Sequence, residues 1–312
     1  MTETRLEGAI VPLVTPFTKD ESVDLAALGR LIDFVLEQGA EALMPTALTG
    51  EGPLLTDSEK ITVWEEVLKQ AGGRAPVAPA IIALTTRQAV ELVRVAERLG
   101  AAAVMAAPIL PELYAGRSQD DVFAFYADLA AASALPLILF NYPSLTGIDF
   151  TPPLVARLSE IPNVKYIKES SGDIRRVHGL QRLLGERIEV ICGAPNVALE
   201  SLCLGCRSWI TGIMNDVPRS ARQLMQAVHT KGDLSLARRI YYRQILPLVD
   251  VMVRNFNPTG TIKAGVSARG VAVGGPRRPG HSVGPEDGLI IGRLMEEAAQ
   301  AEAAAALELA AG

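Results

Sequence analysis

Short apolar runs alternate along the chain with longer segments of helical period. The helical segments, such as residues 24–39 and 86–100, are apolar at positions i, i+3, i+4 and i+7, as amphipathic helices are. The runs are almost wholly apolar, which suits parallel strands covered on both faces. Several helices are predicted to end at a glycine: Gly39, Gly72, Gly100, Gly185 and Gly205. The predicted strands lie within residues 8–17, 41–50, 75–82, 101–108, 135–143, 163–170, 187–194 and 207–215.

Eight strand–helix units of about 30 residues each reach to about residue 230. This number of units predicts an α/β fold, a (β/α)8 TIM barrel over residues 1–230. The alternative is a doubly wound open sheet, which usually carries a GxGxxG loop after its first strand. Here residues 14–20 read VTPFTKD instead, which favours the barrel.

The C-terminal segment, residues 231–312, is predicted to be a helical extension that packs on the barrel or between subunits. Residues 233–256 have the pattern of one or two helices, kinked or broken at Pro247. Residues 274–288 form a loop rich in glycine and proline, and an Ala/Glu-rich helix ends the chain.

Composition excludes several classes of protein. The 312 residues are 49% hydrophobic, and one α/β barrel commonly takes about 250 residues. The net charge is −5 and no basic stripe is present, so we expect no nucleic-acid partner. No apolar run follows a basic start and no window of 18 apolar residues occurs, so we expect no membrane partner and a cytoplasmic location.

Neither the cysteines nor the histidines indicate a metal site or a cofactor. Three cysteines make no disulfide framework. Cys203 and Cys206 have the spacing of half a zinc site, but no second such pair follows. We therefore expect small buried residues at a helix end before Gly205. The histidines, far apart in polar stretches, are predicted to be surface residues: His178, His229 and His281.

A lysine in the sixth predicted strand is the first candidate for chemistry. Residues 163–173 read NVKYIKESSGD, so a strand would place Lys168 on the face of Tyr166. Active sites of such barrels lie at the C-terminal ends of the strands. Burial lowers the pKa of a lysine, and the neutral amine can form an imine with a ketone or an aldehyde. The alternatives are a lysine paired with a buried carboxylate and a lysine that points outward.

Two loops at the same end of the barrel carry further candidates. After the second strand, Thr49 and Gly50 could offer a hydroxyl and backbone N–H groups to an anion, with Glu51 fixing the loop. The alternative is an ordinary turn. After the fifth strand, the Asn-Tyr-Pro sequence of residues 141–143 predicts a rigid loop, in which Tyr142 supplies an acid or base or simply packs.

In this order the motifs resemble the dihydrodipicolinate synthase/N-acetylneuraminate lyase superfamily of class I aldolases. The resemblance runs from residue 8 to about residue 270. Its motifs are TGE at 49–51, NYPSLTG at 141–147, IKESSGD at 167–173 and GxxSWITGxxN at 205–215.

The resemblance implies a role for several residues. In the family, the lysine of the IKE motif forms an imine with pyruvate or another 2-oxo acid, which assigns that role to Lys168. The resemblance also implies a homo-oligomer, a tetramer or a dimer. The positions that it places around the substrate are Leu48, Thr49, Gly50, Phe140, Leu145, Gly193 and Ile210.

The sequence departs from the family in its proton-transfer groups. Leu48 replaces one of the two hydroxyls of the family's loop, and Phe140 replaces its acid/base tyrosine. Residues 107–110 read APIL where synthases have TPYY. Leu145 stands where synthases carry an arginine, and a leucine at this position resembles the sequence of the sialic acid lyases.

We therefore predict a Schiff-base lyase, an aldolase or a dehydratase, with Lys168 and Tyr142 as catalytic residues. Water, the substrate, Tyr114 and Thr211 are other sources of the proton. The alternatives are a dihydrodipicolinate synthase proper and a weakly catalytic protein that binds a 2-oxo acid as a sensor. Loss of an acid/base group favours the sensor, whereas retention of the lysine favours the enzyme.

Overall fold

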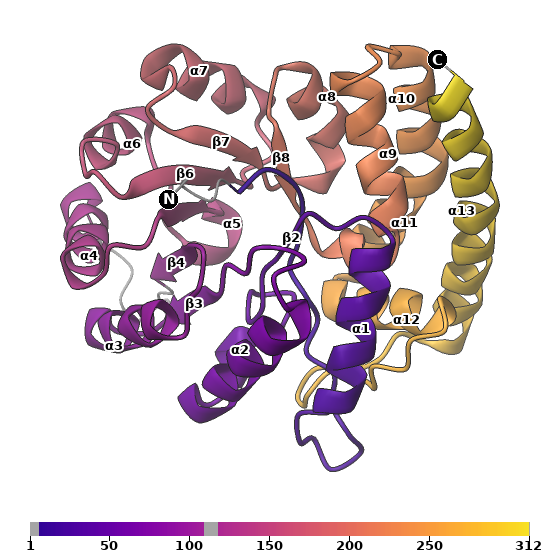
Figure 1. The fold of residues 1–312 in the computed structure, drawn as a ribbon, viewed down its shortest axis with the longest axis horizontal. Helices are drawn as coiled ribbons and strands as arrows, with labels where there is room; N and C mark the ends of the chain where they lie inside the picture. The colour runs from indigo at the N-terminus through magenta and orange to yellow at the C-terminus, as the bar shows by residue number, and fades with distance from the viewer. Residues whose placement is uncertain (1–5, 109–117, 312) are drawn as a thin grey trace.

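The predicted apolar runs form eight parallel strands that curl into a barrel in the computed structural model (Figure 1). The structure describes residues 6–108 and 118–311. Each strand bonds to the next in the order β2-β1-β8-β7-β6-β5-β4-β3, and Leu43 of β2 pairs with Val77 ahead of β3, which closes the circle. The strands are β1 Gly8–Val11, β2 Ala42–Leu43, β3 Ala80–Ala83, β4 Val104–Pro108, β5 Leu137–Asn141, β6 Val164–Glu169, β7 Glu189–Cys192 and β8 Ser208–Ile210. The predicted (β/α)8 fold is confirmed.

Helices that follow the strands form the outer layer. Their ends follow local signals: in α2, Thr56 accepts a hydrogen bond from the amide of Glu59 and donates its own amide to the Glu59 carboxylate, and Gly72 caps the other end with a φ of 54°. The five glycines predicted to end helices all do so. The helices are α1 Leu25–Glu37, α2 Asp57–Ala71, α3 Thr86–Arg98, α4 Gln119–Ala132, α6 Pro152–Leu158, α7 Ile174–Leu184, α8 Ala198–Cys203 and α9 Pro218–His229.

Side chains that alternate along the strands form two cores. Outward side chains pack under the helices, as Ile167 does. Inward side chains form the interior cluster, whose buried members are Leu6, Ile10, Ala42, Met44, Ala47, Ala78, Ala80, Ala103, Met105, Ala107, Ile138, Phe140, Tyr166, Ile191 and Ile210. Tyr166 belongs to this cluster, so the period of two along β6 turns Lys168 toward the interior as well.

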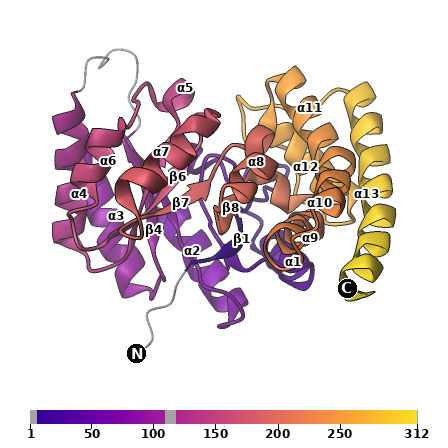
Figure 2. The same cartoon turned by 90° about the horizontal axis from the view of Figure 1, so that it is seen from above.

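The C-terminal segment packs along one side of the barrel. Figures 1 and 2 show α13 Pro285–Ala311 on the outside of the molecule, next to α9 and α12 Pro258–Ala268. A π-helical turn, Tyr241–Ile245, joins α10 Leu234–Ile240 to α11 Leu246–Asn255. Pro247, the site of the predicted kink or break, is the second residue of α11. Proline has no N–H to donate, so a local change of the hydrogen-bond pattern is expected there.

Candidate active site

Lys168 lies inside the barrel near the C-terminal end of β6. Its side chain is 8% exposed, and its Nζ lies 4.5 Å from the centre of the Phe140 ring on the neighbouring strand, in register with it. Both residues are therefore held by backbone hydrogen bonds between β5 and β6. The prediction that Lys168 points inward is confirmed.

Room for the lysine side chain is made by Gly193, which follows β7. A Cβ atom on Gly193 would lie 2.8 Å from Cγ of Lys168 and 2.0 Å from Oγ of Ser170. Any larger residue at this position would displace one of these two side chains. Gly193 thus belongs to the site because of the space that it leaves.

The electrostatic surroundings of Lys168 favour its neutral form. No ion pair in residues 6–108 and 118–311 involves this lysine, unlike the buried lysines Lys60 and Lys263, which pair with Asp57 and Glu51. Burial lowers the pKa of Lys168 from 10.5 to about 8, and the Cys192 thiol opposes this only in part. A free amine is therefore accessible near neutral pH.

The lowered pKa of Lys168 predicts the pH dependence of its reaction with pyruvate. Below a pKa of about 8 the ammonium dominates, so the rate of imine formation should rise about tenfold per pH unit and then level off above that pH. The measurement is timed quenching with borohydride at fixed pyruvate, followed by the mass of the protein. A rate still rising at about pH 10 would mean that the reacting lysine keeps its ordinary pKa.

The loop after β2 is fixed closely against the segment that follows β1. The hydroxyl of Thr15 donates to the Gly50 carbonyl at 2.6 Å, and a Cβ on Gly50 would lie 2.6 Å from the Leu13 carbonyl oxygen. The amides of Glu51 and Gly52 already donate to the carbonyls of Leu48 and Ala47. An anion held by this loop would therefore use the amides of residues 48–50 and the Thr49 hydroxyl.

This loop lies at the same end of the barrel as Lys168. Thr49 packs against Gly212, two residues after Ile210 of β8: a Cβ on Gly212 would be 2.9 Å from Thr49 Oγ1. Ile210 and Leu48 both belong to the packing of the interior cluster. Leu48 thus covers this cluster with an apolar side chain and supplies no hydroxyl.

Tyr142 also packs on the interior cluster. Its ring centre lies 5.9 Å from that of Phe140, although the two residues are two apart at the end of β5. The chain turns there into α5 Pro143–Thr146, and the backbone carbonyl of Tyr142 accepts from both the amide and the hydroxyl of Thr146. The loop therefore turns Tyr142 toward the barrel mouth.

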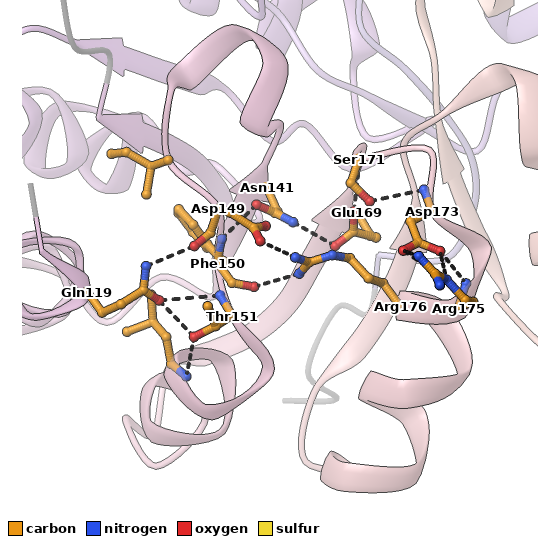
Figure 3. Close-up of polar contacts among 12 residues, drawn as sticks. Gln119, Asn141, Asp149, Phe150, Thr151, Glu169, Ser171, Asp173, Arg175 and Arg176 are labelled. Carbon is orange, nitrogen blue, oxygen red and sulfur yellow. Dashed lines mark hydrogen bonds and ion pairs between the residues drawn. The ribbon is translucent and has the colours of Figure 1, made fainter. Parts of the chain in front are cut away.

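A polar network holds this loop to the end of β6 (Figure 3). The side-chain NH2 group of Asn141 donates to the Glu169 carboxylate at 2.8 Å, and its side-chain oxygen accepts from the backbone N–H of Phe150 at 3.0 Å. Arg176 donates to the Phe150 carbonyl and pairs with Asp149. These contacts fix Tyr142 and Lys168 relative to each other through their sequence neighbours.

Ser170 supplies a hydroxyl that is not among the predicted site residues. It is 8% exposed, and its Oγ finds no hydrogen-bond partner among the residues that the structure describes. It lies two residues after Lys168, so strand alternation alone could have placed it on the same face. A buried hydroxyl without a partner calls for an explanation, and a bound substrate would supply one.

The remaining predicted positions are less informative. Tyr114 and residues 109–110 lie outside the described residues, and so does the side chain of Leu145, which is part of α5. Thr211 is buried. Because Ile210 belongs to the interior cluster and Gly212 lies against Thr49, alternation directs Thr211 to the other side.

In the part of the chain that the structure describes, no cysteine or histidine side chain forms a hydrogen bond with Lys168, although Cys192 affects its pKa. The three histidines are exposed, as predicted. Cys192 and Cys206 are buried, but Cys203 is exposed at the end of α8, so the expectation of two buried cysteines there is wrong for Cys203. It lies on the outer face of a helix of six residues that covers β7 with its other face. Over the described ranges, no group of three or more His, Cys, Asp or Glu side chains is placed to hold a metal ion.

No helix within the described part of the chain is both long and apolar enough to cross a membrane.

Comparison with known families gives a match over nearly the whole chain. The model of the Dihydrodipicolinate synthetase family matches residues 5–297. The 4-hydroxy-tetrahydrodipicolinate synthase of Nitrosococcus oceani is 34% identical over 272 residues, which cover 87% of this chain and 91% of that protein. The protein of that name from Archaeoglobus fulgidus is 33% identical over 273 residues, covering 88% and 91%.

Solved structures agree with the sequence matches. A crystal structure of the dihydrodipicolinate synthase from Aquifex aeolicus has a TM-score of 0.86 and 29% identity, covering 93% of this chain and 97% of that one. The chloride-inhibited dihydrodipicolinate synthase from Acinetobacter baumannii, complexed with pyruvate, has a TM-score of 0.88 and 29% identity, covering 95% and 99%. The similarity thus extends over nearly the whole chain.

Proposed function

Because the chain belongs to the dihydrodipicolinate synthetase family, we propose that it is a Schiff-base lyase in which Lys168 forms an imine with pyruvate or another 2-oxo acid. The observation that carries this proposal is the state of Lys168, which is buried, lies outside the ion pairs of the described residues and has a pKa lowered to about 8. A lysine with these properties is a nucleophile near neutral pH.

The proposed reaction begins with attack of the neutral Lys168 amine on the ketone carbon. The resulting carbinolamine takes up a proton and loses water to give a protonated imine. When a C–H or C–C bond to the neighbouring carbon breaks, the imine accepts the electron pair and becomes an enamine, and the enamine carbon returns this pair when it bonds to an aldehyde carbon or to a proton. Thr49 and the amides of its loop would hold the carboxylate. Phe140 offers the face of its ring to the nitrogen at 4.5 Å, so it stabilises the positive charge of the imine instead of carrying a proton.

We propose that the proton of the reaction passes through Tyr142 or Ser170. Tyr142 has a phenol at the barrel mouth, and Ser170, on the face of Lys168, has a buried hydroxyl with no hydrogen-bond partner among the described residues. The substrate itself and water remain as further sources. We also propose that the enzyme is a homo-oligomer, a tetramer or a dimer, in the cytoplasm, and that it has no nucleic-acid partner.

Reductive trapping tests the proposal directly. Incubation with pyruvate and borohydride should add one reduced pyruvate to the protein, and peptide mass spectrometry should locate it on Lys168. An adduct on another lysine, or none with any 2-oxo acid, would refute the imine. An adduct with no turnover of any aldehyde partner would instead support a sensor that binds 2-oxo acids.

Condensation of pyruvate with aspartate semialdehyde should be very slow. Phe140 has no proton to transfer, Leu48 has no hydroxyl, and Leu145 has no charge for the second carboxylate. A missing acid/base group alone lowers a rate by about 10²–10⁴-fold. The measurement is steady-state turnover with both substrates. A rate in the ordinary range of about 1–10³ s⁻¹ would identify a synthase proper and contradict the argument from these substitutions.

A further inference from the structure

Another buried lysine holds the loop that carries Thr49. Lys263 of α12 is 2% exposed, and its Nζ lies 2.7 Å from Oε1 of Glu51, which is 5% exposed. The same Nζ donates to the Gly275 carbonyl at 2.9 Å and lies 4.3 Å from the centre of the Phe17 ring. Lys263 therefore joins the C-terminal segment to the turn that follows Thr49 and Gly50.

Glu51 needs such support because of its backbone. Its φ of 55° and ψ of 27° lie in the left-handed region, which residues with a side chain rarely occupy unless their surroundings impose it. Both carboxylate oxygens are held from the C-terminal segment: Oε1 by Lys263, and Oε2 by the amide of Arg277 at 2.8 Å. The left-handed turn sets the direction of the amides just before it, which are those left for an anion.

The residue next to Lys263, Ile262, lies against Gly212, and so does Thr49. Cδ1 of Ile262 lies 2.5 Å from the position of a Cβ on Gly212, and Thr49 Oγ1 lies 2.9 Å from that position. Helix α12 is thus joined to the loop through the ion pair at Glu51, and it shares Gly212 as a neighbour with Thr49.

We propose that Lys263 is a positioning residue, whose ion pair with Glu51 keeps the Thr49–Gly50 loop in the conformation that binds the substrate carboxylate. This inference rests on the proposed function, since it assumes that a 2-oxo acid binds there. It assigns Lys263 no contact with the reacting atoms. Loss of the pair should therefore weaken binding of pyruvate and leave the reactivity of Lys168 nearly unchanged.

The test compares Lys263→Met with a control that breaks another buried pair. Arg269, the C-terminal cap of α12, pairs with Glu302 at 2.7 Å, with 10% and 3% exposure, and contacts α13 instead of the loop. Lys263→Met and Arg269→Met should both lower the melting temperature. Only Lys263→Met should raise the pyruvate concentration for half-maximal trapping, by about tenfold or more, with the maximal trapping rate changed less than about threefold.

If Lys263→Met does not fold, Glu51→Gln tests the positioning role of the ion pair instead. The amide keeps the size of the side chain and an acceptor for Arg277, while Lys263 can lose its proton because burial already lowers its pKa. The same rise in the half-maximal concentration is expected, and Lys263→Arg should restore part of the affinity lost in Lys263→Met. If the folded variants match Arg269→Met in affinity while the wild type forms its adduct, the positioning role is wrong and the proposed function stands. If the wild type forms no adduct on Lys168, the proposed function itself fails.

Discussion

Lys168→Ala should abolish the reduced pyruvate adduct and all turnover. The change removes the amine that becomes the imine nitrogen, and water cannot replace a covalent intermediate. The measurement is the mass of the protein after pyruvate and borohydride, together with turnover on the substrate. The variant should not be destabilised by a buried carboxylate left without its partner, since no carboxylate in the described structure pairs with Lys168.

Controls for this variant come from lysines in the same chain. Lys165 is on the same strand three residues earlier, with a partly exposed side chain, and Lys165→Ala should keep the adduct at the wild-type level. Lys263 is the strongest competitor, because it is buried and its pKa is also lowered by burial. Its ion pair with Glu51 favours the charged form, so we expect no adduct there. An adduct retained in Lys168→Ala and located on Lys263 would overturn the assignment.

The barrel could be predicted from the sequence because each strand is covered on both faces. Almost wholly apolar runs such as residues 135–143 predict such strands directly. The period of two placed Lys168 on the face of Tyr166, and the structure shows that this face points inward. Helix α12 carries no comparable signal: its sequence PTGTIKAGVSA contains two glycines and two threonines, which are poor helix formers, and packing on the barrel stabilises it instead.

The parts of the site that were missed depend on contacts between distant segments. Lys263 lies more than 200 residues from Glu51 in the chain, and no local pattern reports that the two are paired. Glu51 itself was expected to fix its loop by hydrogen bonds, and the structure gives the partners. Ser170 could have been found by the alternation that placed Lys168, but whether a hydroxyl is satisfied depends on its neighbours, here Gly193.

Tyr142→Phe should lower turnover on the true substrate by about 10²–10⁴-fold, the usual contribution of an acid/base group. Phe140 cannot shuttle a proton, whereas Tyr142 has a phenol and packs on the interior cluster beside it, with the two rings 5.9 Å apart. The ring remains in the variant, so its packing on the interior cluster and the melting temperature should change little. The imine on Lys168 should still form, because the amine is untouched. Steady-state kinetics and trapping on the same preparation separate the two steps.

Ser170→Ala is the matched control, since it removes the other hydroxyl proposed for this role. If Tyr142 carries the proton, Ser170→Ala should lower turnover by less than about tenfold. If Ser170 carries it, Ser170→Ala should lower turnover by about 10²–10⁴-fold and Tyr142→Phe by less than about tenfold. Losses below tenfold in both variants would move the role to water or to the substrate. Phe140→Tyr adds a phenol beside the Lys168 nitrogen, so gain of synthase or sialic acid lyase activity in that variant would show that only the proton shuttle separates this site from theirs.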